Sequence, residues 1–363
     1  MLWIIGLGIN GAKGISLHAL DILKTCDKIF IERFTSQLTD SDIDELHDIL
    51  YGQNKGNQII KIVPRWYVED GREILSMSSN EIIAILTYGD PFIATTLNEL
   101  YVRAVKNSIQ TGIIHAASGL TSLIGETGLH LYKFGRTVTV MSDPQSCISV
   151  YNIVHDNLKS GNHSLILTEY SNINNDNSPF FLDPKKVFQM LKEIETDVKY
   201  NVFTNDTFVI VASRIGSIKQ NIIAGKIESL KDFDFGNGPH SIIVPGILHF
   251  TETDALRILS KIIDEPIDNS KLIYDISRSM VEKYIPKAKE ALEQMRNYIN
   301  KKSNQNEKIN EGIYNVIENA EYYLYDAERF FIQKKMELSI LSIGYAEGLI
   351  DSLRYQWGIN PWS

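Results

Sequence analysis

Short apolar runs alternate with amphipathic stretches along the first 116 residues. Five runs have the composition of buried strands: "LWIIG", "DKIFIE", "QIIKIVP", "EIIAILTYG" and "GIIHAA". Apolar positions spaced three and four residues apart in the segments between them predict helices. This alternation of strand and helix predicts right-handed crossovers and a mostly parallel sheet. Ligands of such sheets bind beyond the carboxyl ends of the strands, which is where the pattern places residues 6–14 and 88–91.

Residues 117–265 repeat this mixture and predict a second α/β domain. Its strand-like runs are "RTVTVM", "HSLILTEY", "DTFVIVASRIGS" and "HSIIVPG". Helical spacing recurs between and after them at 146–158, 184–197 and 251–264. The predicted fold therefore begins with two α/β domains, 1–116 and 117–265.

The hydrophobic pattern changes character over residues 275–363. An apolar seam there has the alternating steps of four and three residues that are typical of packed helices. Its members are Val281, Ile285, Ala288, Leu292, Met295 and Ile299. Two further stripes follow, so we predict a three-helix bundle, with 264–271 as the linker before it and 300–308 as its first turn. Pro286 should lie near the start of the first helix or kink it.

Composition and charge narrow the class of protein. The 363 residues are 44% hydrophobic and 22% charged, as in ordinary globular proteins. The net charge is -9, and the bundle, with 12 basic and 13 acidic residues, contributes little of it. An acidic chain lacks the surplus Lys and Arg that neutralise phosphates, so we expect no direct binding of nucleic acid. Two cysteines without a C-x-x-C motif, and the lack of an apolar run of ~20 residues, lead us to expect a cytoplasmic protein outside the membrane.

The stretch "IIGLGINGAKG", residues 4–14, matches the G-x-G-x-x-G turn of dinucleotide-binding folds. Glu32, at the end of the next predicted strand, is placed to accept hydrogen bonds from ribose hydroxyls. In a dinucleotide-binding fold the third glycine, here Gly11, lies inside the helix that follows the turn. Ser16, however, is a candidate N-cap, and a helix that begins there would leave Gly11 outside it. The motif alone leaves open an NAD-binding oxidoreductase and a loop without a ligand.

Three further motifs follow predicted strands or lead into them: "LTYGDPFIATT" (86–96), "HAASGLTSLIGETGLHLYKFGRTVTV" (115–140) and "GPHSIIVPGILHFTE" (238–252). The second lacks G-x-S-x-G, so a hydrolase nucleophile elbow is not indicated. No spacing indicates a metal site or a nucleophilic dyad, and we assign neither a metal nor a catalytic residue. We interpret His115, His130 and His249 as structural, and Lys133 as packing its stem beside Phe134.

With "IERFTS" and "NDTFVIVASRIGS", these motifs resemble the tetrapyrrole methylase-like, S-adenosylmethionine (SAM)-dependent methyltransferases, and within them the archaeal diphthine synthase family. In order and spacing the match covers roughly residues 1–262. The resemblance implies two α/β domains with SAM in the cleft between them, usually in a homodimer. It also implies cofactor contacts at Ile9, Asp90, Ile93, Ser118, Gly119, Thr168, Ile215 and His240. The chain departs from the family at Leu97, where histidine is usual, and at Gly119, where a larger apolar residue is more frequent.

The resemblance further implies a reaction and a partner. It implies methylation of the amino group on the 3-amino-3-carboxypropyl arm of a modified histidine of translation elongation factor 2, giving diphthine and S-adenosylhomocysteine (SAH). A related reaction on a corrin or ribosomal RNA stays open, as does a non-catalytic binding protein with the same fold. Residues 275–363 resemble a small archaeal helical domain of unassigned function, which we interpret as a docking domain for the elongation factor or the ribosome.

Overall fold

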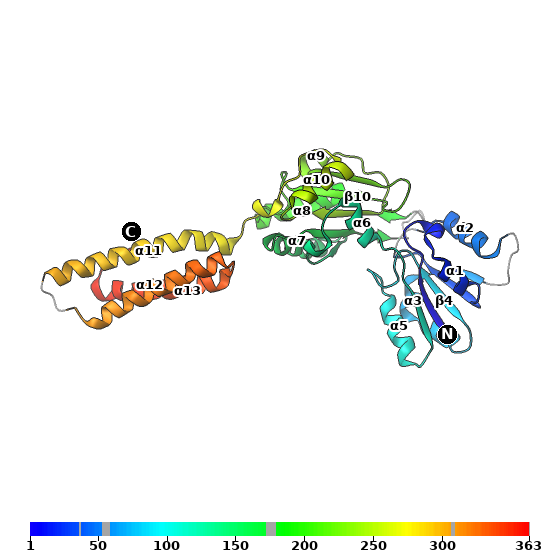
Figure 1. The fold of residues 1–363 in the computed structure, drawn as a ribbon, viewed down its shortest axis with the longest axis horizontal. Coiled ribbons are helices and arrows are strands. Elements are labelled where there is room, and N and C mark those ends of the chain that lie inside the picture. The colour runs from blue at the N-terminus through cyan, green and yellow to red at the C-terminus, as the bar shows by residue number, and fades with distance from the viewer. Residues whose placement is uncertain (36–37, 53–58, 172–178, 306–308, 363) are drawn as a thin grey trace. The chain divides into compact units, whose positions relative to one another are not determined.

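The computed structural model describes residues 1–35, 38–52, 59–171, 179–305 and 309–362. They form two compact units, Met1–Ile273 and Tyr274–Ser363. The first unit contains two large β-sheets with helices, and the second is built from three long helices (Figure 1). This confirms the predicted combination of α/β fold and helical bundle. Among the described helices, none combines the length and the apolar character needed to cross a membrane.

The first sheet has the strand order β3-β2-β4-β1-β5, and all of its pairings are parallel. Its strands are β1 (Leu2–Gly6), β2 (Lys28–Glu32), β3 (Ile59–Val63), β4 (Ile83–Thr87) and β5 (Thr111–Ile114). The five predicted apolar runs therefore do form one parallel sheet. Strands β1 and β4 lie at its centre, and every residue of β4 is buried.

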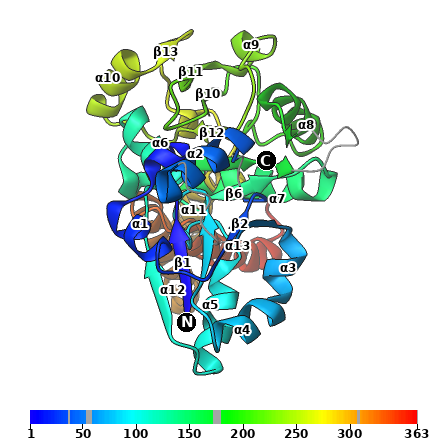
Figure 2. The same cartoon turned by 90° about the vertical axis from the view of Figure 1, so that its right-hand side faces the viewer.

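Helices cover both faces of this sheet. Their bounds are α1 (Leu17–Leu23), α2 (Asp40–Tyr51), α3 (Arg65–Asp70), α4 (Arg72–Ser78) and α5 (Leu97–Lys106), and a 3-10 turn, η1, spans Gly11–Gly14. The apolar sides of α1 and α2 pack on one face, and those of α3, α4 and α5 pack on the other (Figure 2). Because both faces are covered, the strands are continuous apolar runs rather than alternating ones.

The second sheet is mixed and has the order β13-β11-β10-β12-β7-β6. Its strands are β6 (Val138–Val140), β7 (Ser164–Thr168), β10 (Phe208–Ser213), β11 (Asn221–Lys226), β12 (His240–Val244) and β13 (Lys261–Ile262). Strand β10 runs antiparallel to β11 and β12. The sequence pattern identified the runs at β6, β7, β10 and β12 but missed β11.

Helices α6 (Gly119–Thr127) and α10 (Phe250–Leu259) pack on one face of the second sheet, and α7 (Pro144–Lys159) and α8 (Pro184–Val198) on the other. The helix predicted over 251–264 is too long. It ends at Leu259 because the chain turns extended at Ser260 and forms β13, which pairs with β11. The predicted boundary at residue 116 falls between β5 and α6, inside the first compact unit, and stays a prediction.

Short elements complete the first unit. They are η2 (Leu131–Lys133), β8 (Tyr170–Ser171), β9 (Phe180–Phe181), α9 (Ile227–Leu230) and η3 (Asn269–Lys271). Strands β8 and β9 pair antiparallel as a two-stranded ribbon. The hydroxyl of Tyr170 in β8 donates to the backbone oxygen of Arg33, which follows β2 of the first sheet. This bond connects the ribbon to the loop after β2.

The second unit consists of α11 (Ile276–Asn304), α12 (Glu311–Ile332) and α13 (Met336–Trp357). All six residues of the predicted seam are buried between the helices. The turn predicted over 300–308 begins too early, because α11 continues through Asn304, and residues 306–308 lie outside the described part of the chain. Pro286 lies inside α11.

Candidate active site

The strand order of the first sheet fixes where a ligand should bind. From β1 the chain crosses to β2 on one side, and from β4 it crosses to β5 on the other. The loops after β1 and β4, which are neighbouring strands, therefore leave in opposite directions. Such a switch point opens a crevice beyond the carboxyl ends of the strands and is the usual ligand site of α/β sheets. The two loops at this point are the glycine-rich motif, residues 4–14, and the motif that contains Gly89, Asp90 and Pro91. We call the second one the GDP loop, after the one-letter codes of these three residues.

These two loops are joined by backbone hydrogen bonds. The amide of Gly8 donates to the oxygen of Gly89 at 3.2 Å, and the amide of Gly89 donates to the oxygen of Gly8 at 2.8 Å. Both glycines have positive φ, +75 and +79, which residues with a side chain rarely adopt. At Gly6 an added Cβ would lie 2.5 Å from the Gly89 oxygen. The glycines thus allow the two loops to pass close to each other.

The carboxylate of Asp90 organises the corner after β4. One oxygen accepts from the amide of Phe92 at 3.0 Å. The other lies 2.8 Å from Nδ1 of His115 and accepts from the amide of Ala116 at 3.2 Å. Asp90 is buried, and its carboxylate is hydrogen-bonded to two backbone amides and one imidazole. It ties the loop after β4 to the loop after β5, across the end of β1.

The rest of the GDP loop has an exposed apolar side chain and one residue with a strained backbone. Ile93 is 37% exposed, which leaves it available for contact with a ligand. Ala94 has φ +58, a left-handed conformation that costs on the order of 1 kcal/mol for a residue with a Cβ. Strain of this kind gathers at functional sites, and it accords with a binding role for the loop.

Ser118 and Gly119 begin α6 after the end of β5. The Ser118 hydroxyl is buried and accepts a hydrogen bond from the amide of Leu120 at 3.3 Å, so it caps the helix. An added Cβ at Gly119 would meet no atom within 4 Å. The open space at Gly119, rather than the buried Ser118 hydroxyl, is where a ligand can approach.

Two predicted residues of the second sheet form one hydrogen-bonded cluster. The hydroxyl of Thr168 donates to the backbone oxygen of His240 at 2.8 Å. Nδ1 of His240 lies 2.8 Å from the hydroxyl of Ser213, and the histidine is buried. Burial disfavours the charged imidazolium and lowers the pKa of His240 to about 4. At neutral pH this side chain is therefore an uncharged structural partner of Ser213, the last residue of β10 before the loop that follows it.

That loop brings Ile215 and Ile9 into the same region. Arg214 has φ +55, and its guanidinium donates to the backbone oxygens of Lys219, Phe235 and Asn237, which fixes the turn. At the adjacent Gly216 an added Cβ would lie 2.6 Å from the Ile9 side chain. The glycine loop of the first sheet therefore packs directly against the loop after β10.

The residues present fit SAM as a ligand. SAM is an adenosine with a sulfonium-bearing amino acid arm, and it needs open backbone and apolar contacts more than a charged clamp. Space beside Gly89 and Gly119 leaves the backbone accessible, since the nearest atom to an added Cβ at Gly89 is 3.9 Å away. Ile93 adds an exposed apolar side chain to the same loops. The cofactor contacts predicted for Ile9, Asp90, Ile93, Ser118, Gly119, Thr168, Ile215 and His240 stay predictions.

The dinucleotide interpretation loses its two supporting features. One oxygen of Glu32 accepts from the amides of Phe34 and Thr35, both at 3.0 Å, and the other accepts from the hydroxyl of Thr87. Glu32 is 1% exposed, so it is not placed to bind a ribose. Helix α1 begins at Leu17 with Ser16 as its cap, as predicted, and Gly11 lies before it.

A second histidine and carboxylate cluster lies between η2, the start of β7 and the start of α10. Glu252 accepts from Nε2 of His163 at 3.0 Å, from the amides of His130 and His249, both at 2.8 Å, and from Lys133. Burial alone would raise the pKa of Glu252, but these donors outweigh it and lower the pKa to about 2. Lys133 therefore pairs with a buried carboxylate, which the sequence analysis missed.

Comparison with known proteins identifies the class. Residues 1–231 match the family model of the Tetrapyrrole (Corrin/Porphyrin) Methylases, and residues 283–357 match a protein family of unknown function, DUF357. The chain therefore belongs to the tetrapyrrole methylase family. It is a SAM-dependent methyltransferase, and its similarity within the family is to diphthine synthases.

Two curated relatives and one solved structure illustrate this similarity. The diphthine synthase of Methanocaldococcus jannaschii is 34% identical over 262 residues, which cover 71% of this chain and 98% of the relative. That of Methanococcus maripaludis strain C7 is 36% identical over the same shares. A crystal structure of a diphthine synthase has a TM-score of 0.62 at 25% identity and covers 75% of this chain and all of its own.

Proposed function

We propose that this chain methylates the amino group on the 3-amino-3-carboxypropyl arm of the modified histidine of translation elongation factor 2, the diphthine-forming step of diphthamide biosynthesis. The curated relatives named diphthine synthase support this substrate, because the shared segment spans 98% of their length. The structural observation that carries the proposal is the pair of loops joined at Gly8 and Gly89. Since the substrate works in translation, the proposal places the enzyme in the cytoplasm.

The chain's own task in this reaction is positioning. SAM, when bound, supplies an activated methyl group on a sulfonium. Positive charge then passes from sulfur to nitrogen, so no strong stabiliser of new charge is required. Orientation of two reactants can supply on the order of 7 to 11 kcal/mol of such a barrier. The paired loops, held by the Asp90 corner, are suited to this role because they are rigidly connected to three adjacent strands.

Mass spectrometry of elongation factor 2 tests the proposal. The full chain is incubated with SAM and with factor that carries the precursor arm, and each transfer should add one methyl group to the modified histidine. Factor with an unmodified histidine serves as the control and should gain none. A precursor-bearing factor that stays unchanged would contradict the proposal, and the number of methyl groups added would establish the product.

Ligand titration tests the cofactor site independently. SAH should bind saturably in calorimetry, and NADH should not. Gly119→Arg places a large charged side chain, unlike the apolar one frequent in the family, in the open space beside α6 and should weaken SAH binding at least tenfold. Gly348→Arg, at a position in α13 where an added Cβ also meets no atom within 4 Å, is the matched control and should leave binding unchanged.

We further propose that the chain forms a homodimer, and an apolar surface around η2 and α10 supports this. Its exposed side chains include Leu131 (61%), Tyr132 (83%), Phe250 (71%) and Ile258 (81%). The rings of His130 and His249 join the two aromatic side chains into one row. Exposed apolar patches of this kind mark interaction sites. Replacing Tyr132 and Phe250 by serine should yield monomers in sedimentation equilibrium, and a wild-type monomer would contradict the proposal.

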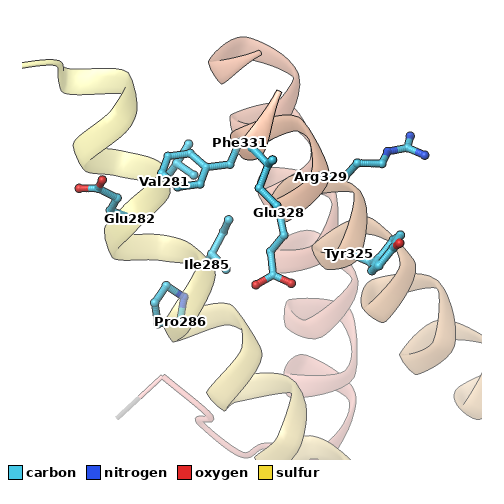
Figure 3. Close-up of a pocket in the computed structure, with 9 residues that line it drawn as sticks. Val281, Glu282, Ile285, Pro286, Tyr325, Glu328, Arg329 and Phe331 are labelled. Carbon is cyan, nitrogen blue, oxygen red and sulfur yellow. The ribbon is translucent and has the colours of Figure 1, made fainter. Parts of the chain in front are cut away.

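For the helical unit we propose docking of the elongation factor. A pocket of about 510 Å³ lies between α11 and α12 (Figure 3). Its lining residues are Val281, Glu282, Ile285, Pro286, Tyr325, Glu328, Arg329, Phe331 and Ile332. The double variant Tyr325→Ser, Ile332→Ser should raise KM for the factor several-fold without changing kcat. Tyr355→Ser, exposed but outside the pocket, is the control. An unchanged KM in the double variant would contradict the docking role.

A further inference from the structure

The Asp90 corner presents a histidine whose outer nitrogen is available. Nδ1 of His115 lies 2.8 Å from an Asp90 oxygen, and a carboxylate can only accept there, so Nδ1 carries the proton. The Nε2 atom then bears a lone pair, and it has no hydrogen-bond partner among the described residues. The His115 side chain is 67% exposed, whereas that of Asp90 is 6% exposed. A buried carboxylate thus orients an accessible base.

This histidine follows directly after β5, the strand beside β1, so it stands at the edge of the switch-point loops. Its ring packs edge-on against Phe92 of the GDP loop, with the ring centroids 6.1 Å apart. Asp90 and Phe92 therefore hold the imidazole from two sides. The base lies on the same loops that the candidate cofactor contacts occupy.

The other titratable groups at these loops are engaged or uncharged. Both oxygens of Glu32 are occupied by internal donors. The hydroxyl of Tyr88 donates to the Ile9 oxygen at 2.6 Å. His240 is buried and bonded to Ser213. Of the groups described at the loops, His115 combines a lone pair with access to solvent.

We propose that His115 is the proton acceptor of the methyl transfer, with Asp90 as its positioning residue. The inference rests on the proposed function, because the acceptor nitrogen enters as an ammonium and must lose a proton before it can attack. The N–H electron pair stays on nitrogen while the proton moves to Nε2 of His115. The nitrogen lone pair then forms the N–C bond, and the C–S bond pair returns to sulfur, which leaves neutral SAH. Asp90 stabilises the resulting imidazolium, which releases its proton to solvent before the next round.

Substitution of the base tests the catalytic part. His115→Gln keeps an amide that can donate to Asp90 but has no proton-accepting nitrogen, so kcat should fall about 10²- to 10⁴-fold. The affinity for SAH, measured by calorimetry, should stay within about twofold. Free imidazole should restore part of kcat to His115→Ala. His18→Ala, at an exposed position in α1, is the matched control and should retain wild-type kcat.

A measurement without turnover tests the geometric part. In ¹⁵N NMR of histidine-labelled full chain, His115 should show the Nδ1–H tautomer, and Asp90→Ala, which removes the acceptor, should abolish that preference. An Nε2–H tautomer in the wild type would overturn the inference, and so would wild-type kcat in His115→Gln. A loss of kcat matched by an equal loss of SAH affinity would also overturn it, because that pattern is structural. Failure of the wild type to methylate the factor, with the expected tautomer present, would instead contradict the proposed function.

Discussion

Among the described histidine–carboxylate pairs of the first unit, two have similar lengths and opposite surroundings. His163 and Glu252 are 3.0 Å apart, and both side chains are fully buried. His115 and Asp90 are 2.8 Å apart, but the histidine is 67% exposed. In the first pair every polar atom of the imidazole is used, because Nδ1 of His163 accepts from the amide of Gly246 at 2.9 Å. In the second pair Nε2 of His115 has no hydrogen-bond partner among the described residues.

The difference shows that a histidine–carboxylate pair alone does not indicate a catalytic role. A histidine whose two nitrogens are both hydrogen-bonded within the protein is structural, whereas one with a free nitrogen can take part in a reaction. Burial lowers the pKa of His163, so its partner Glu252 carries the charge of that pair and is neutralised by Lys133. Such a closed network joins η2, β7 and α10 and contributes to stability. The open pair can exchange a proton with a ligand without breaking its internal bond. The following predictions compare buried groups, which should affect folding, with the open pair, which should affect chemistry.

Removal of the buried carboxylate should have the largest effect on stability. Glu252→Ala leaves Lys133, His163 and two backbone amides without their acceptor, and breaking a buried pair in this way costs about 3–5 kcal/mol. Urea unfolding would measure the loss. Glu265→Ala breaks an exposed pair with Arg257 of 2.8 Å and should cost less than about 1 kcal/mol. Equal losses in the two variants would show that the Glu252 network is not the stabilising element proposed.

Burial of His240 should make the stability of the chain depend on pH. The pKa of His240 is about 4 in the folded chain and 6.5 when the group is unperturbed. Between these values the unfolded chain binds a proton that the folded chain does not, so stability falls as pH drops from about 6.5 to 4. The shift corresponds to ~3 kcal/mol.

The test of this prediction is a difference between two pH profiles. Urea unfolding of wild type and of His240→Gln would be compared from pH 7 to pH 4, and the wild type should lose more. His163 and Glu252 titrate in both proteins, so their contributions cancel in the comparison. Parallel profiles would show that burial does not keep His240 neutral.

Local sequence was enough to predict the parallel sheet and the bundle. The strands β1 to β5 are apolar runs because helices cover both faces, and the seam of α11 keeps its period over its whole length. Strand β11 was missed because "NIIAGK" is short and contains Gly225, and its position depends on pairing with β10 and β13. The glycine and GDP loops were found because turn chemistry is local.

The two histidine pairs were not found because they are made by residues far apart in sequence. Asp90 meets His115 only because β4 and β5 flank β1, a strand order that the sequence pattern does not contain. Lys133 meets Glu252 across 119 positions in the sequence. The neighbouring Phe134, on which the interpretation of Lys133 was based, gave no indication of this pair. The one signal available was that His115 directly follows a predicted strand, where ligand-binding residues gather.

Crowding the close approach between Gly6 and the loops after β4 and β5 should have an intermediate effect on stability. An added Cβ at Gly6 would lie 2.5 Å from the Gly89 oxygen and 2.8 Å from Cβ of Ala116, so Gly6→Ala forces the loops after β4 and β5 apart. We expect a loss of about 1–3 kcal/mol and weaker SAH binding. Gly344→Ala, in open space on α13, should be neutral or stabilise by about 0.5–1 kcal/mol. Unchanged SAH binding in Gly6→Ala would show that the corner does not shape the site.

The smallest effect on stability is expected for the open pair itself. His115→Ala removes a mostly exposed ring and leaves Asp90 bonded to the amides of Phe92 and Ala116, so unfolding free energy should change by less than about 1 kcal/mol. Urea unfolding beside Glu252→Ala would make the contrast direct. A loss of several kcal/mol would mean that His115 belongs with the closed network. A small loss of unfolding free energy, combined with a large fall in kcat, would show that His115 acts in the reaction and contributes little to folding.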